Sequence, residues 1–365
     1  MQRRSFLQAG AAASLLGTFP RLTLAQQLPY DPQPAGWRTF ETVTRIELQF
    51  AEGTSRVWVP VPSVESDYQK VLGNSWSANG SARIVSDGKY GANMVMAEWS
   101  PAEKNPVLEV VSTFSTRNRA VDLSKRDPSI KALDAPSHAF YTAPTELIQT
   151  DGIVRQTARE ITRGKFSDMD KARAIYEWVV DKTERNPKTR GCGIGDVKSM
   201  LETGNLTGKC ADLNALYVGL ARAAGLPARD VYGLRVARSE FGYRSLGTGS
   251  PNVTRAQHCR AEVYLVGYGW VPVDPADVRK VVLEEKPQPT TLADPLVPAV
   301  RAKLFGAWEM NWLAYNDAHD VKLPGSSGPA VGFLMYPQAE TAKGRFDELD
   351  PDNFKYTITA RELKA

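Results

Sequence analysis

Alternating hydrophobic and polar positions dominate the first third of the chain. Residues 42–50 alternate with a period of two, and a second strand-like stretch, residues 55–59, follows a turn at Gly53. This period is typical of strands that bury one face. No helical period is present before about residue 121, and no catalytic motif. The pattern therefore predicts an all-β accessory domain over residues 36–125.

The pattern becomes helical in the middle of the chain. Residues 126–165 are predicted to form a connecting segment with one helix near residues 152–162. Ser167 and Asp170 form a helix-start pair. The apolar positions that follow lie on one helical face, and they are Ala172, Ile175, Tyr176 and Val179. A loop and a short helix near residues 197–202 come next.

The next predicted helix places a cysteine in its first turn. Gly208-Lys209-Cys210 begins this helix and Gly225-Leu226-Pro227 ends it. Its apolar stripe comprises Leu213, Leu216, Tyr217, Leu220 and Ala224. A continuous stripe of this kind indicates that the helix packs against a core.

Strands return after this helix. They are predicted at residues 230–237, 257–266 and 270–273, and the last two form a hairpin around Gly267-Tyr268-Gly269. Further strands are expected near residues 308–314, 331–335 and 354–360, where they would complete the same domain. The chain is therefore predicted to be α+β, with a cysteine-bearing helix packed on an antiparallel sheet and an all-β domain before it.

Composition and charge argue against a disordered chain and against a nucleic-acid-binding protein. The 365 residues are 42% hydrophobic and 24% charged, which is the balance of a folded globular protein. The net charge is +4, and it falls to +1 without the three arginines of residues 1–25. No basic run is present, so a nucleic-acid partner is not expected.

The N-terminus resembles a twin-arginine export signal. Arg3 and Arg4 precede a short apolar stretch, and Thr23-Leu24-Ala25 places small residues at a cleavage position. Residues 1–25 are therefore predicted to be a signal peptide, and the mature protein to be periplasmic or extracellular with no stable membrane span. An uncleaved anchor helix is the alternative, although the apolar run is shorter than the ~20 residues of a span.

The three cysteines leave at least one thiol free. Cys192 and Cys259 could form a disulfide in an oxidising compartment, or all three could stay reduced. A metal site made by the cysteines and His258 is not expected, because closely spaced ligand pairs are absent. No cofactor is expected either.

One set of residues could form a nucleophilic site. Cys210 stands where the positive end of a helix dipole favours a thiolate. Of the three histidines, His258 begins a strand, and Asp274 ends the next one. These three residues would make a Cys–His–Asp triad. A regular hairpin would place Asp274 opposite Glu262, so the triad would need a bulge or strong twist, and Glu262 is a rival orienting acid.

Four ordered blocks resemble the transglutaminase-like superfamily. They are Gly208-Lys209-Cys210-Ala211-Asp212, residues 220–233, His258-Cys259-Arg260-Ala261-Glu262-Val263-Tyr264 and Gly269-Trp270-Val271-Pro272-Val273-Asp274-Pro275. The resemblance implies a catalytic domain over residues 166–365 with its motif core at 166–285. It also implies that Cys210 is the nucleophile, His258 the general base and acid, and Asp274 the orienting group.

Arg260 departs from the family pattern, because many relatives have an aromatic residue there. This departure suggests a different substrate channel or charge preference. The oxyanion donor of some relatives, a residue upstream of the cysteine, has no identified counterpart, and the amide of Cys210 is one candidate.

The resulting hypothesis is acyl chemistry on an amide. The substrate would be a peptide, protein or cell-wall amide, and hydrolysis through a thioester is favoured because water is the abundant acceptor. Protein cross-linking by transfer to an amine is the alternative within the family. A non-catalytic binding module is the alternative from another class, and loss of a triad residue would be its signature.

Overall fold

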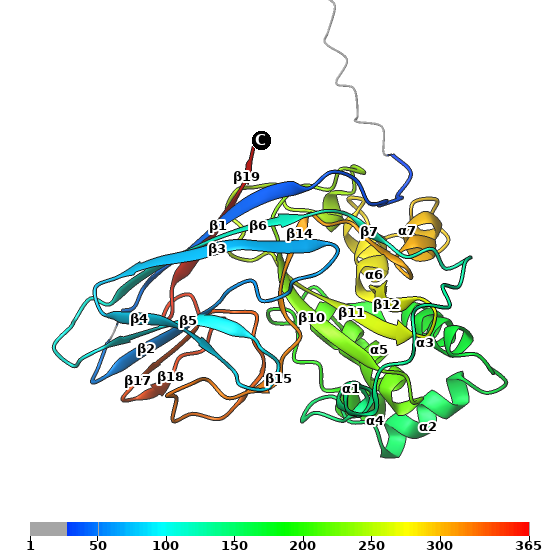
Figure 1. Ribbon diagram of the computed structural model, residues 1–365, viewed down its shortest axis with the longest axis horizontal. Helices are drawn as coiled ribbons and strands as arrows, with labels where there is room; N and C mark the ends of the chain where they lie inside the picture. The colour runs from blue at the N-terminus through cyan, green and yellow to red at the C-terminus, as the bar shows by residue number, and fades with distance from the viewer. Residues whose placement is uncertain (1–27, 50, 365) are drawn as a thin grey trace, which may run out of the picture.

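The computed structural model describes residues 28–49 and 51–364 (Figure 1). The predicted signal peptide at residues 1–25 lies outside these residues. Long β-strands form one end of the molecule, and the helices lie around a third sheet at the other end. None of the helices within the described ranges has the length and hydrophobicity of a membrane span.

Two antiparallel sheets pack face to face at the β-rich end. The first contains, in spatial order, β19 (Tyr356–Leu363), β1 (Arg38–Glu47), β6 (Val107–Thr116) and β3 (Gln69–Ala78). The second contains β18 (Gly344–Arg345), β17 (Gln338–Thr341), β2 (Ser55–Pro60), β5 (Asn93–Trp99) and β4 (Ser81–Ser86). Alternate residues of β1 are buried, as the sequence pattern predicts, because one face of each sheet meets the other. The buried side chains between the sheets include Ile46, Val57, Val95, Leu108 and Val110.

The C-terminal strands differ from the prediction. The strand predicted near residues 354–360 was expected to complete the catalytic domain, but the corresponding strand β19 pairs with β1. Strand β17, which the sequence pattern did not predict, pairs with β2. The last strands thus provide hydrogen-bond partners for edges of β1 and β2 that would otherwise be unpaired. The segment 166–365 is therefore not self-contained. Periodicity identifies a strand but not its partner, which is why the sequence did not reveal this return.

The third sheet carries the helical layer. Its antiparallel strands are β12 (Gly269–Val273), β11 (Gln257–Leu265), β10 (Ala228–Arg235) and β14 (Trp312–Asn316). Helix α5 (Cys210–Ala223) packs against β10 and β11, which confirms the predicted helix-on-sheet core. The helices that contact α5 are α1 (Ala135–Thr142), α2 (Gly152–Ile161), α3 (Asp168–Lys182), α4 (Val197–Thr203) and α6 (Pro275–Glu284).

Short elements connect these layers. The two-stranded pairs are β7 (Arg119–Ala120) with β13 (Ala307–Trp308), β8 (Glu184–Arg185) with β9 (Thr207–Gly208), and β15 (His319–Val321) with β16 (Val331–Phe333). The remaining helices are α7 (Val297–Lys303) and the short η1 (Arg244–Leu246). The β7–β13 pair ties the chain that leaves the β-rich end to the helical end.

Candidate active site

Cys210 is the first residue of α5. Its side chain is 4% exposed and lines a cavity of about 630 Å³ together with His258. The position at the helix N-terminus places the thiol near the positive end of the helix dipole, which favours a thiolate. All the remaining residues of α5 up to Arg222 are buried as well. The helix is therefore a rigid support that presents one reactive atom to a space that a ligand can enter.

Asp212 fixes the loop that precedes Cys210. Its carboxylate accepts hydrogen bonds from the backbone N–H groups of Ile194, Gly195 and Lys209, each at 3.0 Å. These bonds hold the segment from Cys192 to Gly195 against the first turn of α5. A carboxylate at this position also suits the positive end of the helix. The acidic residue in the Gly-Lys-Cys-Ala-Asp block thus holds the loop around Ile194 and Gly195 in place.

Gly193 packs directly on this carboxylate. Its φ is +90°, and a Cβ at this position would collide with the side chain of Asp212. We therefore expect Gly193→Ala to lower the free energy of unfolding by about 2–3 kcal/mol, because it combines a strained backbone with overpacking. Gly204→Ala is the control, because Gly204 has φ +69° with nothing near its Cβ. Equal losses for the two variants in urea unfolding would contradict the steric argument.

His258 is held by the acidic residue that the sequence identifies. Its Nε2 lies 2.8 Å from Oδ2 of Asp274. Asp274 follows β12 directly and caps α6, because its Oδ1 accepts the backbone N–H of Asp277 at 3.0 Å. The amide of Asn214 lies 3.4 Å from the same Oδ1. With Nε2 on the carboxylate, Nδ1 is the ring nitrogen left for the thiol.

The hairpin register explains how this contact forms. Glu262 lies opposite Pro272, and Ala261 lies opposite Val273. The prediction that Asp274 faces Glu262 is therefore wrong by two residues along β11, because the turn is centred on Gly267 and not on Tyr268. Asp274 leaves the strand level with Arg260, close enough for its side chain to reach His258. The β11–β12 pairing is regular, so the bulge that the sequence argument required is unnecessary.

Glu262 is excluded as the orienting acid. Its carboxylate is fully buried and binds Arg119 and Arg229, the latter at 2.6 Å. Although burial opposes it, the two guanidinium groups lower the pKa of Glu262. Glu262 thus forms an ion-pair network away from His258.

Replacing Glu262 by glutamine should affect stability and leave the thiol alone. We expect Glu262→Gln to cost about 3–5 kcal/mol of unfolding free energy, because the buried Arg119 loses its close counter-charge and the partly exposed Arg229 keeps only Asp317. Since the folded-state pKa of Glu262 is lowered, its contribution is present above the ordinary carboxyl pKa and is lost as the pH falls through the lowered one. Urea unfolding from pH 7 to pH 3 tests this. A change in the alkylation rate of folded Cys210 would contradict the separation of the two sites.

A second carboxylate near His258 was not anticipated. Oδ1 of Asp277 lies 3.4 Å from Nε2 of His258, and both oxygens of Asp277 bind Nη2 of Arg235 at 2.6 and 2.7 Å. Asp277 stands three residues after Asp274, in the first turn of α6. Its position at N-cap plus three was the available signal, since this spacing brings a side chain back toward the cap.

The charges around His258 favour its protonated form. Burial and Arg235 both lower the pKa of His258, but Asp277 and Asp274 outweigh them and raise it to about 9. The pKa of the Cys210 thiol moves the other way. Interactions with Cys192, Cys259 and His258 lower it well below its usual value, against the effect of burial. Between the two pKa values the pair is a thiolate and an imidazolium, which is the reactive form of a cysteine nucleophile.

The three cysteines of the chain lie together. The Sγ atoms of Cys192, Cys210 and Cys259 all lie within 4.8 Å of one another, and each thiol is free. The disulfide between Cys192 and Cys259 is therefore not formed, and the alternative of free thiols holds. Cys192 donates to the carbonyl of Gln257 at 3.3 Å. Ligand spacing in the sequence gave no sign of this cluster, because the three residues come from a loop, a helix and a strand.

Arg260 does not border the cavity. Its side chain is 1% exposed, donates to the carbonyl of Glu309 at 3.0 Å and stacks over the Trp312 ring at 4.7 Å. Its Nε lies 3.6 Å from Oδ2 of Asp274. The suggestion that Arg260 alters the substrate channel is therefore wrong. The residue lies behind the Asp274 carboxylate.

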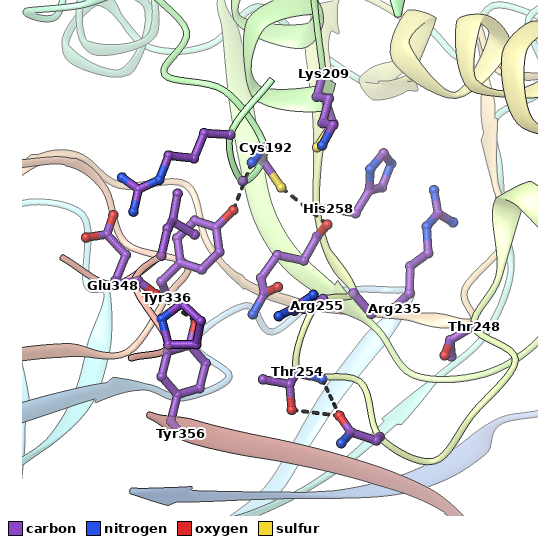
Figure 2. Close-up of a pocket in the computed structure, with 18 of the residues that line it drawn as sticks. Cys192, Lys209, Arg235, Thr248, Thr254, Arg255, His258, Tyr336, Glu348 and Tyr356 are labelled. Carbon is purple, nitrogen blue, oxygen red and sulfur yellow. Dashed lines mark hydrogen bonds between the residues drawn. The ribbon is translucent and has the colours of Figure 1, made fainter. Parts of the chain in front are cut away.

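The cavity itself is bordered by segments that are distant in sequence. Figure 2 shows Cys192, Lys209 and His258 on one side, with Tyr336 and Tyr356 facing them. The hydroxyl of Tyr336 accepts the backbone N–H of Cys192 at 3.0 Å. The C-terminal part of the chain thus supplies a wall of the space in front of Cys210.

Known proteins resemble this chain in sequence. The sequence pattern of the transglutaminase-like superfamily matches residues 155–275. An uncharacterised protein of Haemophilus influenzae is 36% identical over 327 residues, which cover 86% of this chain and 88% of the relative.

One solved structure shares the fold over most of the chain. A crystal structure from Cytophaga hutchinsonii, described as a candidate cysteine protease, has a TM-score of 0.50 at 16% identity and covers 90% of this chain and 99% of its own. The periplasmic domain of TgpA from Pseudomonas aeruginosa is also similar, with a TM-score of 0.36 and 14% identity over 68% of this chain and 89% of its own. The match of its sequence pattern places the core of the chain, residues 155–275, in the transglutaminase-like superfamily.

Proposed function

We propose that the protein is an exported cysteine-dependent hydrolase of peptide or other amide bonds. The observation that carries the proposal is geometric, because Cys210 and His258 border one cavity and the His258 ring lies 2.8 Å from the Asp274 carboxylate. The lowered pKa of Cys210 and the raised pKa of His258 support it, since together they favour a thiolate and an imidazolium. A buried cysteine with a structural role gains nothing from such a pair. The contact of His258 with Asp274 supports a triad in which the carboxylate orients the ring and stabilises its positive charge.

The geometry supports a two-step reaction. In the first step the Cys210 thiolate attacks the carbonyl carbon of the amide, and the C–N bond breaks after the His258 imidazolium gives its proton to the leaving nitrogen. The product is a thioester and a free amine. In the second step neutral His258 takes a proton from water, the oxygen attacks the thioester, and Cys210 leaves as the thiolate.

The oxyanion of each step needs a donor. The backbone N–H of Cys210 lies in the first turn of α5 and therefore has no intrahelical acceptor. A donor at this point is adjacent to the attacking sulfur, as stabilisation of a developing oxyanion requires. We assign it this role.

Product analysis in ¹⁸O-labelled water separates hydrolysis from transfer. The mature chain is incubated with a peptide-amide library in H₂¹⁸O, with and without a primary amine. Hydrolysis predicts one ¹⁸O atom in each new carboxylate, and transfer predicts an amine adduct that replaces it. The Cys210→Ala variant is the control. Absence of any thiol-dependent product, together with no thioester in the mass spectrum of the acid-quenched protein, would sink the enzymatic proposal and favour a binding module.

Export is the second part of the proposal. It rests on Arg3 and Arg4 and the short apolar stretch that follows them. Replacing both arginines by lysine should retain the protein in the cytoplasm, because the paired arginines are read by a receptor. Cell fractionation with an antibody measures the result, and unchanged secretion of the double variant would contradict it.

A further inference from the structure

Basic side chains dominate the cavity in front of Cys210. Apart from His258, six of its lining residues are basic and one, Glu348, is acidic. The basic residues are Arg185, Arg190, Lys209, Arg235, Arg255 and Lys280. This local excess contrasts with a nearly neutral mature chain, so charge is concentrated where the proposed substrate would enter.

Some of this charge is compensated from behind the cavity wall. Arg185 lies 2.5 Å from Glu284, and Arg190 lies 2.6 Å from Asp347. Lys280 has a weaker ion pair, because its Nζ lies as far as 3.9 Å from Glu284 and Arg185 already pairs with that carboxylate. These ion pairs reduce the positive charge at the rim but do not remove it.

Two cations remain without an acidic partner in the part of the chain that the structure describes. Lys209 immediately precedes the nucleophile, and Arg255 lies three residues before His258. In Figure 2, Lys209 lies above His258 and Arg255 lies below it. Unpaired charge on both sides of the reacting groups is well placed to contact the two flanks of a bound chain.

Two hydrogen-bond donors without an acceptor also border the cavity, and a ligand with acceptor groups would satisfy them. The Nε2 of Gln257 and the Nε of Arg235 are buried without a partner, and both residues line the cavity. A buried donor without an acceptor is costly unless a ligand supplies one. Repulsion in the cavity is visible as well, because burial, Arg235 and Arg185 lower the pKa of Lys280 to about 8.

We infer that the acyl donor is a negatively charged peptide, which carries a carboxylate within a few residues of the amide bond that Cys210 attacks. This inference rests on the proposed amide chemistry and names the substrate class. The cavity volume of about 630 Å³ falls in the range of pockets that hold small ligands or short peptide segments. Lys209 and Arg255 would then select the substrate by its charge, and the triad would act on any bond placed before it.

A peptide series tests this selection. Acetylated hexa-alanine amides carry one Glu, Gln or Lys at each position in turn, and kcat/KM for cleavage is measured by mass spectrometry at low salt. The best Glu peptide should exceed its Gln counterpart by about tenfold, and each of Lys209→Gln and Arg255→Gln should reduce that ratio by about fivefold. The ratio cancels general effects on folding or chemistry. Arg83→Gln, an exposed cation on β4, is the matched control and should keep the wild-type ratio.

Binding separates this inference from the proposed reaction. The Cys210→Ala variant is titrated with the same Glu and Gln peptides by calorimetry. Tighter binding of the Glu peptide, weakened by 0.5 M salt, supports the anionic ligand even if the native protein cleaves neither peptide. Equal binding, absence of binding, or a Glu preference that survives both charge variants overturns it. Cleavage without any Glu preference would leave the hydrolase and remove the charge selection.

Discussion

Removing the sulfur of Cys210 is expected to lower kcat for amide cleavage by about 10⁴-fold or more, which is the range for loss of a nucleophile that acts as one unit with its base. The thiolate is the attacking atom, and the residues nearest to it offer no replacement on the same helix terminus. KM should change little, because alanine leaves the cavity walls intact. The measurement is steady-state cleavage of the best peptide from the library.

Cys192→Ala is the matched control for this loss. Cys192 is also a buried thiol that lines the cavity, and its Sγ lies within 4.8 Å of Cys210. Because its interaction contributes most to the lowered pKa of Cys210, we expect a moderate loss, about tenfold near neutral pH, that disappears at higher pH. Equal and pH-independent losses in both variants would contradict the assignment of Cys210 as the nucleophile.

Removing the imidazole of His258 is expected to change the pH profile of thiol alkylation. In the wild-type protein the pKa of Cys210 is depressed, so we expect the thiolate, and its reaction with iodoacetamide, to persist to lower pH than for an ordinary thiol. His258→Ala removes the cation that contributes to this shift. Because Cys192 and Cys259 contribute more to this shift than His258 does, we expect the inflection to move part of the way toward the ordinary thiol pKa near 8.5. The alkylation rate below the inflection should then fall by about tenfold.

The upper limb of the wild-type profile gives a second check. Because the pKa of His258 is raised to about 9, the imidazolium persists through neutral pH, and cleavage that needs it as an acid should decline as the pH rises past 9. His138→Ala is the control, since His138 is exposed on α1. A profile of His258→Ala identical to that of the wild type would disprove the Cys210–His258 ion pair.

The sequence was sufficient for the features that depend on local pattern and order. The Cys210 helix, the strand that carries His258 near its start and the position of Asp274 after β12 follow from periodicity and from four ordered blocks. The contact between His258 and Asp274 agrees with the predicted triad, although the predicted hairpin register was wrong. The error in register did not affect the predicted contact, because Asp274 lies just beyond the end of β12 and its side chain is long enough to reach His258.

The features that were missed depend on contacts between distant segments. Nothing in the spacing of Cys192 and Cys259 relates either residue to Cys210, since the loop position is fixed by hydrogen bonds to Asp212. Asp277 is paired with Arg235 from another strand, and this pairing is invisible in the sequence. The two cations that flank the reacting groups became recognisable only when the described residues showed no acidic partner for either.

The return of the C-terminal strands has a consequence for biosynthesis. The wall facing Cys210 includes Tyr336, Leu349, Phe354 and Tyr356, all from the last 30 residues of the chain. Because translation proceeds from the N-terminus, the ribosome makes the nucleophile more than 100 residues before the surface that would hold a substrate against it. A nascent chain thus carries the thiol without its pocket until the segment from Tyr336 to Tyr356 has been synthesised. The proposed activity would begin only after that segment has folded onto the cavity.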